Sequence, residues 1–132
     1  NAVNAALDRI DAELDPKLAR VQGHVVATYT NGSPEPLGEL WLHLRQNLHA
    51  PDAVRNTRVQ VTGGMQIDRV QVGGAPATTN VDGTRLHVPL ERPLGPGEHV
   101  AVAMDFGFEV PAGEAPRMGH DDHSLFFVGY WY

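Results

Sequence analysis

Cysteine is absent from the 132 residues, which excludes disulfide bonds, zinc–thiolate sites and a thiol nucleophile. Lysine is almost absent: Lys17 stands alone, and ten basic side chains face 16 acidic ones, for a formal charge of −6. Proteins that bind nucleic-acid backbones need clustered basic residues, so we expect no nucleic-acid partner. No apolar run approaches the roughly 20 residues of a membrane-spanning helix, so we expect no membrane span either.

Serine occurs only as Ser33 and Ser124, which leaves little for nucleophilic catalysis. Ser33 lies between Gly32 and Pro34, in a segment of turn-forming residues. Ser124 follows His123, but neighbouring side chains of an extended segment point apart, so these two cannot form the hydrogen bond between base and nucleophile. We therefore expect no catalytic residue in this chain.

The composition suits one folded domain spanning residues 1–132. Hydrophobic residues make up 42%, enough for a core and too many for a disordered chain. The absence of cysteine does not indicate a compartment, because a core of this size needs no disulfide bond in either an oxidising or a reducing environment. The first residue is Asn1 rather than Met, which indicates a removed leader or a trimmed chain. The compartment stays open, and this start tilts the expectation towards an exported rather than a cytoplasmic protein.

Every second residue from Val100 to Val110 is apolar, and small or acidic side chains stand between them. This period of two predicts a strand with one buried face and one face in solvent. At about 3.3 Å per residue the run would span roughly 35 Å, which is long for a strand. The pattern indicates an antiparallel β protein.

Shorter apolar alternations and turn-forming residues predict the remaining elements. Strands are expected at 10–14, 21–29, 40–44, 59–61, 67–72, 86–90 and 125–132. Turns are expected at 15–17 and 31–36, loops at 47–56 and 111–119, and a hairpin at 81–84 with Asp82 and Gly83 at its centre. The slipped spacing between Ile67 and Val70 predicts a β-bulge, and Pro89 predicts an edge position or a strand end.

No segment carries a helical stripe, and residues 3–7 could form at most one helical turn. We therefore predict an all-β fold, an antiparallel β-sandwich of seven to nine strands.

Several short sequence motifs occur together in a recognisable order. They are Gly23 with Tyr29-Thr30-Asn31, then Leu37, Leu40, His43-Leu44 and Asn47, then Pro93-Leu94-Gly95-Pro96-Gly97-Glu98, Phe106 to Pro111, Arg117 with Gly119, and Trp131-Tyr132. In this order and spacing the chain resembles the N-terminal domain of M1-family zinc metallopeptidases, from about Leu7 to Tyr132.

The resemblance implies a β-sandwich that packs against a catalytic domain and helps wall its substrate cleft. The family's catalytic signature, HExxH with a downstream Glu ligand, is absent here, so no zinc ligand can be assigned. Gly63-Gly64-Met65-Gln66 is similar to the family's GxMEN substrate loop, but it lies too early and lacks the Glu, so we reject the match. The expected partners are a catalytic domain and a peptide substrate, and the expected cofactor is zinc, all belonging to a larger aminopeptidase-like parent.

A dense group of metal-ligand side chains occurs at His120-Asp121-Asp122-His123. In an extended segment His120 and His123 point to opposite faces, and the two adjacent carboxylates diverge as well. We therefore interpret the group as a solvated loop between strands. A metal site that uses His120 and His123 stays open as the alternative.

Aromatic side chains concentrate at the end of the chain: Phe126, Phe127, Tyr130, Trp131 and Tyr132. One interpretation is a central strand buried on both faces. The other is that one face belongs to a contact with a neighbouring domain, in which case an exposed aromatic patch would favour a homodimer.

Two further patterns have simple and functional interpretations. Trp41 and His43 lie opposite the leucine face of their strand, so they form either a plain surface or the patch of an autonomous module that binds protein or carbohydrate. Asn31-Gly32-Ser33 fits the N-glycosylation pattern, but Pro34 disfavours its use and a turn explains the same residues. His24, His49, His87 and His99 are scattered and suggest no pairing.

Overall fold

The computed structural model describes residues 5–113, 117–122, 124–129 and 131. Almost all of the regular structure is strand: β1 (Ala5–Asp15), β2 (Arg20–Thr30), β3 (Leu37–His43), β4 (Gln66–Val72), β5 (Ala75–Pro76), β6 (Asn80–Asp82), β7 (Arg85–Leu94), β8 (His99–Glu109), β9 (Met118–Asp121) and β10 (Leu125–Val128). A short 3-10 helix, η1 (Arg45–His49), follows β3. The all-β prediction is confirmed. The part of the chain described here has ten strands, more than the seven to nine predicted. The difference arises because β5, β6 and β9 are too short to show a period in the sequence.

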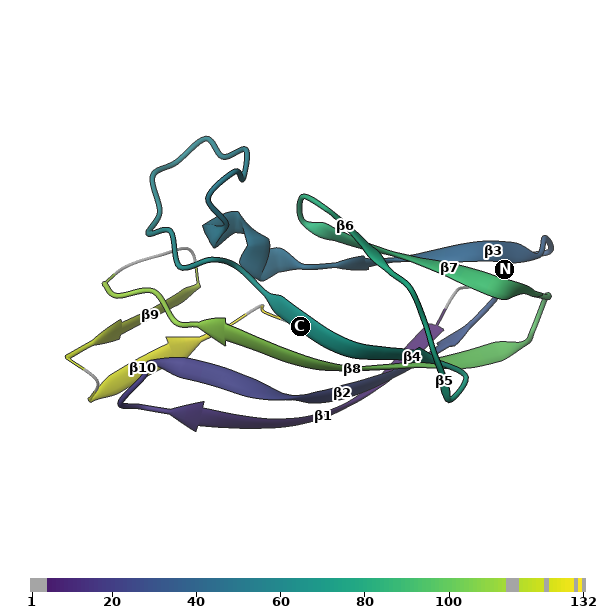
Figure 1. Ribbon diagram of the computed structural model, residues 1–132, viewed down its shortest axis with the longest axis horizontal. Coiled ribbons are helices and arrows are strands. Elements are labelled where there is room, and N and C mark those ends of the chain that lie inside the picture. Colours follow the sequence, from purple (N-terminus) through teal and green to yellow (C-terminus); the bar gives the residue numbers. More distant parts are fainter. Residues whose placement is uncertain (1–4, 114–116, 123, 130, 132) are drawn as a thin grey trace.

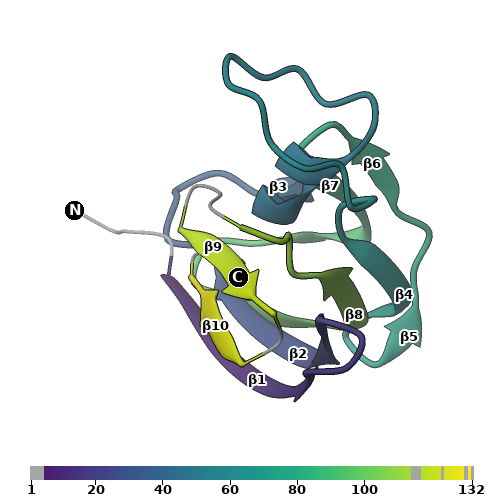
Figure 2. The ribbon, with the colours of Figure 1, turned by 90° about the vertical axis from the view of Figure 1, so that its left-hand side faces the viewer.

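The strands form three antiparallel sheets. The largest has the order β1-β2-β8-β4-β5, the second β3-β7-β6, and the third contains β9 and β10. Figure 1 shows the five-stranded sheet along the lower side, the three-stranded sheet above it, and the β9–β10 hairpin at one end. In the end-on view of Figure 2, β3 lies on the side of β1 and β2, whereas β6 lies on the side of β4 and β5.

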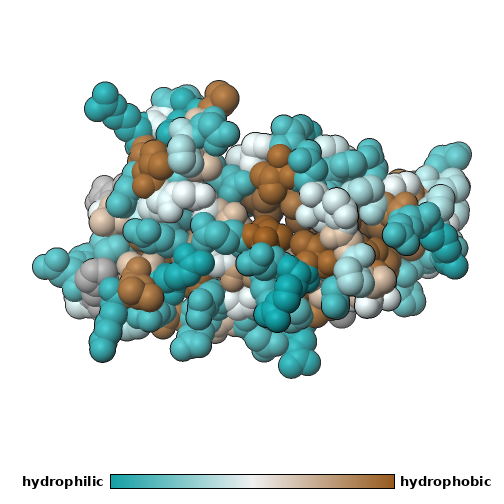
Figure 3. Space-filling model, in the orientation of Figure 1, coloured by the Kyte–Doolittle hydropathy of each residue, from teal (hydrophilic) through white to brown (hydrophobic). Residues whose placement is uncertain are grey.

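Both smaller sheets cover the same face of the large sheet. β8 alternates as predicted, and its inward side chains, Val102, Met104, Phe106 and Phe108, are buried. Val102 and Met104 belong to an apolar cluster with β3 and β7, whereas Phe106 and Phe108 belong to a second cluster packed by Phe126, Val128 and Trp131. In Figure 3 apolar side chains gather between the layers, while the outer surface is mostly hydrophilic. Within the described residues no helix is long and apolar enough to cross a bilayer.

The turn after β2 is built around one fully buried polar side chain. The Asn31 amide nitrogen donates to the carbonyl oxygens of Glu35 and Leu94, both at 2.9 Å, and its oxygen accepts from the Ser33 N–H at 2.9 Å. Its backbone N–H donates to Glu98 at 2.9 Å. Every hydrogen-bonding group of this side chain is therefore engaged inside the fold, and the turn interpretation of the Asn-Gly-Ser segment is confirmed.

Two short-range predictions are confirmed in detail. Asp15 closes the β1–β2 turn, since its carboxylate accepts the N–H groups of Lys17 and Leu18 at 2.9 and 3.1 Å. The bulge in β4 is present as a shift of register between Asp68 and Gln71 opposite β8. Gly23 allows close strand approach, because a Cβ there would lie 2.1 Å from the Asp11 carbonyl oxygen of β1.

Other local predictions are wrong or need adjustment. Val59 and Val61 lie in an irregular loop and not in a strand, because the backbone beside them bonds elsewhere. The Gln60 carbonyl oxygen accepts from the His49 Nδ1 at 2.8 Å, and the Thr62 N–H donates to the His49 carbonyl at 3.0 Å. The β6–β7 hairpin exists, but Asp82 pairs with Arg85 and the two turn residues are 83 and 84.

The predictions for residues 3–7 and for Pro89 are only partly confirmed. Residues 5–7 are strand and not helix, while residues 3 and 4 lie outside the described residues. Pro89 lies in the middle strand of its sheet, but the β6 pairing ends at His87, so β7 has only the β3 neighbour at Pro89. The missing N–H of proline is tolerated where a strand has an open side.

Candidate functional site

A large apolar hollow lies between the two main sheets. We call it the slot; its volume is about 540 Å³ and it runs between the inner face of β1 and β2 and the strand β3. Its floor includes Ile10, Val25, Ala27 and Tyr29, and Trp131 lines it as well. The upper sheet has three strands over a lower sheet of five, so the strip of the lower sheet beneath the outer side of β3 is left open. The size matches sites that hold an apolar group.

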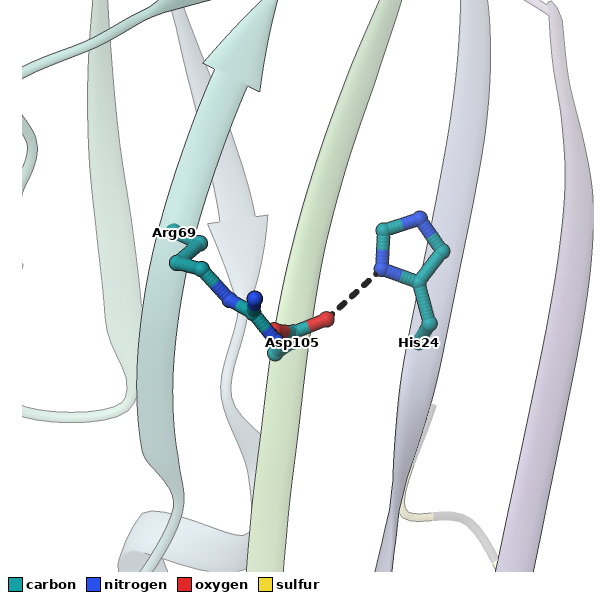
Figure 4. A network of polar contacts seen from close by, with 3 residues as sticks. All are labelled: His24, Arg69 and Asp105. Atoms are coloured by element: carbon teal, nitrogen blue, oxygen red, sulfur yellow. Dashed lines mark hydrogen bonds and ion pairs between the residues drawn. The ribbon is translucent and has the colours of Figure 1, made fainter.

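The outer face of the five-stranded sheet carries a polar network (Figure 4). The register places His24 of β2 and Asp68 of β4 on either side of Asp105 in β8. His24 Nδ1 lies 2.8 Å from the Asp105 carboxylate, and the Arg69 guanidinium contacts the other carboxylate oxygen. The hydrogen bond from His24, followed by the hydrogen bond from Arg69, lowers the pKa of Asp105 below its usual value.

The β4 bulge explains why Arg69 reaches Asp105. Arg69 has a φ of +49°, the left-handed conformation of a bulge residue, which turns its side chain towards the neighbouring strand. Asp68 and Asp105 face each other directly, and two like charges in that position repel. Arg69 and His24 offset this repulsion, so the network stabilises the pairing of three strands. Among the described residues no group of three or more His, Asp or Glu side chains is arranged to hold a metal.

The Trp41 surface is already engaged within the molecule. The Trp41 ring stacks on His87 of β7 with centroids 4.4 Å apart, and the Arg85 guanidinium lies 4.8 Å from the ring centroid. His87 in turn contacts the Glu39 carboxylate, and this hydrogen bond, with a second one from Trp41, lowers the pKa of Glu39. Trp41 remains 46% exposed, and His43 is exposed as predicted. A carbohydrate would have to compete with these side chains for the ring.

His120 and Asp121 end strand β9, so the loop interpretation is wrong for these two residues, whereas residues 122 and 124 belong to the turn that leads to β10. Asp121 accepts hydrogen bonds from the Leu125 N–H at 2.6 Å and the Ser124 hydroxyl at 2.9 Å, which lower its pKa. The His120 ring stacks on Phe126 with centroids 5.2 Å apart. His123 lies outside the described residues, so the metal alternative at His120 and His123 stays a prediction. Asp121 already serves the turn.

The terminal aromatic residues divide between the two faces of β10. Phe126 is partly buried and packs on the core, whereas Leu125 and Phe127 are 67% and 63% exposed. Trp131 packs against Phe106 and Phe108, with ring centroids 4.8 and 5.5 Å away. Burial on both faces is therefore wrong for Phe127. Tyr130 and Tyr132 lie outside the described residues, and their role stays a prediction.

The sequence does not indicate the two histidine–carboxylate pairs, and it offers no nucleophile. His24 and His87 each meet a carboxylate from a neighbouring strand, although their sequence separations from these partners are 81 and 48 residues. The strand register places His24 directly opposite Asp105, and it places His87 opposite Trp41, two residues along β3 from Glu39. The Ser33 hydroxyl donates to the Glu35 carbonyl at 2.8 Å, so Ser33, like Ser124, serves a turn.

No family model and no curated protein matches the sequence. Solved structures do match the fold. An M1 zinc metallopeptidase mutant from Deinococcus radiodurans matches with a TM-score of 0.55, 19% identity, and coverage of 80% of this chain and 20% of that chain. The mutant from the same organism bound to a Tyr-Ser-Ala substrate matches with a TM-score of 0.53 and 20% identity over 77% of this chain and 19% of that one.

A two-domain M1 zinc metallopeptidase mutant bound to L-tryptophan also matches, with a TM-score of 0.54, 20% identity, and coverage of 80% of this chain and 20% of that chain. At this identity the likeness concerns the fold. The chain thus resembles one domain of M1 zinc metallopeptidases and spans about one fifth of their length.

Proposed function

We propose that the chain is a non-catalytic β-sandwich domain of an M1-type zinc metallopeptidase, which packs against the catalytic domain and helps wall its substrate cleft. The observation that carries the proposal is the fold match, which covers 80% of this chain but 20% of the metallopeptidase. The sequence motifs between Leu7 and Tyr132, which resemble the N-terminal domain of that family, support the same proposal.

The residues that the structure describes do not fit a resident zinc ion. The sequence has no HExxH, and the described residues hold no cluster of three ligands. Zinc, the peptide substrate and the bond-breaking step therefore belong, in this proposal, to another part of the protein. In this proposal the domain contributes a surface for contact with the rest of the enzyme. We further propose that the enzyme is exported.

The outer face of β10 is the proposed contact with the catalytic domain. Leu125 and Phe127 point away from the core and are mostly exposed, while Phe126 and Val128 hold the strand in place. Exposed aromatic and aliphatic side chains on a supported strand suit a protein interface. In the isolated chain the same face would favour a homodimer.

The test is the gene together with an assay. We expect the reading frame beyond residue 132 to encode HExxH with a downstream Glu, and the longer product to cleave amino-acyl p-nitroanilides in a zinc-dependent manner. The 132-residue chain alone, at the same concentration, should show no cleavage. A native stop codon directly after Tyr132, or zinc-dependent cleavage by the purified chain, would overturn the proposal and favour an autonomous module.

A further inference from the structure

A second, smaller pocket lies where η1 faces the β9 strand (Figure 2). We call it the η1 pocket; its volume is about 290 Å³, and its polar lining includes His43, Arg45, Gln46, His49 and Thr84. None of the described residues that line it is acidic, although the chain carries 16 acidic and 10 basic side chains. A pocket without a carboxylate in so acidic a protein favours a negatively charged ligand.

The η1 pocket contains a cation without an internal counter-charge. Arg45 is exposed, and of the arginines in the described part of the chain only Arg45 and Arg58 have no hydrogen-bond or ion-pair partner. Arg58 belongs to the loop after η1 and does not line the pocket. His43 is exposed and has no partner among the described residues either. His43 and Arg45 also border the slot, so the two hollows adjoin at the end of β3.

The wall of the pocket is buried and held in place. Gln46 and His49 are each 3% exposed. The His49 Nδ1 donates to the Gln60 carbonyl oxygen at 2.8 Å, because a carbonyl can only accept, and this bond ties η1 to the following loop. The Gln46 amide nitrogen lies 3.5 Å from the Glu109 carbonyl oxygen, which is long for a hydrogen bond. Within the described residues the Gln46 side chain has no other partner, so a buried amide N–H is left for a ligand.

We propose that the η1 pocket binds a carboxylate carried on a short hydrocarbon chain, with the carboxylate on Arg45 and the Gln46 amide. A guanidinium holds a planar carboxylate through two parallel hydrogen bonds. Leu48 and Met118 also line the pocket and offer apolar contact to the hydrocarbon chain, a part that inorganic phosphate lacks. A free short-chain acid and the acidic side chain of a protein share this chemistry. The inference goes beyond the proposed function and does not depend on it.

The test is an NMR titration of the 132-residue chain at pH 7, which follows the backbone amide resonances. Butyrate is the probe, and butyramide is its neutral counterpart of nearly the same shape. Sodium chloride at equal ionic strength controls for screening. We expect butyrate to shift the amides of residues 43–49 in a saturable manner, with a dissociation constant on the order of 1–10 mM. Butyramide and sodium chloride should leave these amides in place.

Three variants show whether Arg45 carries the binding. Arg45→Gln removes the charge and should weaken butyrate at least about tenfold. Arg58→Gln is the matched control, because Arg58 is also exposed and without a partner among the described residues but lies outside the pocket; it should keep the natural affinity. Arg45→Lys keeps the charge and loses the planar fork, so its affinity should fall between the other two. It also carries the test where Arg45→Gln disturbs the amide spectrum as a whole.

N-acetyl-glutamyl amide distinguishes the two sources of the carboxylate. Binding at least as tight as that of butyrate identifies the acidic side chain of a protein, weaker binding identifies a free acid, and both results support the pocket. Equal shifts with butyrate and butyramide, or butyrate binding that Arg45→Gln leaves unchanged, would overturn the inference. Inorganic phosphate that binds more tightly than butyrate would refute the carboxylate as the ligand. No peptidase activity enters these measurements, so their failure leaves the proposed function untouched.

Discussion

Replacing Asn31 with alanine should be among the most costly polar substitutions in this protein. The side chain is fully buried and makes three hydrogen bonds, two to carbonyl oxygens and one from a backbone N–H. Each is worth about 1 kcal/mol net, and the partners left behind cannot all reach water. We therefore expect Asn31→Ala to lower the free energy of unfolding by about 3 kcal/mol, a large share of the roughly 5–15 kcal/mol typical of a domain.

The assay is urea unfolding followed by tryptophan fluorescence. With a urea dependence of about 2 kcal/mol per molar, a loss of about 3 kcal/mol moves the midpoint down by about 1.5 M. Asn56→Ala is the control, because Asn56 is exposed and accepts a hydrogen bond from the Thr57 hydroxyl at 3.2 Å. It should stay within about 0.5 kcal/mol of the natural chain. A difference below about 1 kcal/mol between the two variants would refute the role assigned to Asn31.

Asn31→Asp sharpens the same test through pH. The new oxygen would face the Glu35 and Leu94 carbonyl oxygens that now accept from the amide, both at 2.9 Å. Repulsion and burial would raise the pKa of the introduced carboxyl in the folded state. The variant's deficit against the natural chain should therefore be largest at neutral pH and shrink as pH falls through that raised pKa. A deficit that does not change with pH would contradict this geometry.

Three further outcomes follow from the structure. His24→Ala should raise the pKa of Asp105 towards its usual value, seen by carboxyl-carbon NMR, because the lowered pKa comes first from the His24 hydrogen bond. The stabilisation from this pair should be complete above the ordinary Asp pKa of about 3.9 and be lost as pH falls through the lowered one; an Asp105 that titrates at or above about 3.9 in the natural chain would contradict it. Phe127→Ser should leave the short chain within about 0.5 kcal/mol of normal, whereas Phe126→Ser should cost about 2 kcal/mol; equal effects in urea unfolding would refute the two faces of β10. Gly23→Ala should speed hydrogen exchange of β1 amides, because its Cβ would collide with the Asp11 carbonyl, and unchanged exchange would show that β1 can shift away freely.

The sequence predicts the long strands because their signal is local. The apolar residues of the alternation from Val102 to Phe108 are buried in β8, and Ala103 and Asp105 between them are half-buried. The turn at Asp15 and the bulge after Ile67 are also local, since each follows from the spacing of neighbouring residues. Short elements fail for the same reason: Ala75–Pro76 is too brief for a period to show.

The parts of the site that the sequence misses depend on distant partners. Asn31 binds the Leu94 carbonyl across 63 positions, and His24 meets Asp105 across 81. Nothing near either residue indicates these contacts; they follow once the strand order and register are known. At Val61 the local pattern wrongly predicts a strand. The backbone that follows it instead forms hydrogen bonds with the His49 carbonyl oxygen, which no local pattern indicates.

β8 has a consequence for how the protein melts. It runs through both apolar clusters, and Val25, Met65 and Ile67 pack against both as well. Neither half of the sandwich can lose its side-chain contacts while the other keeps all of its own. Unfolding should therefore be all-or-none, and the β8 amides should exchange only when the whole molecule opens.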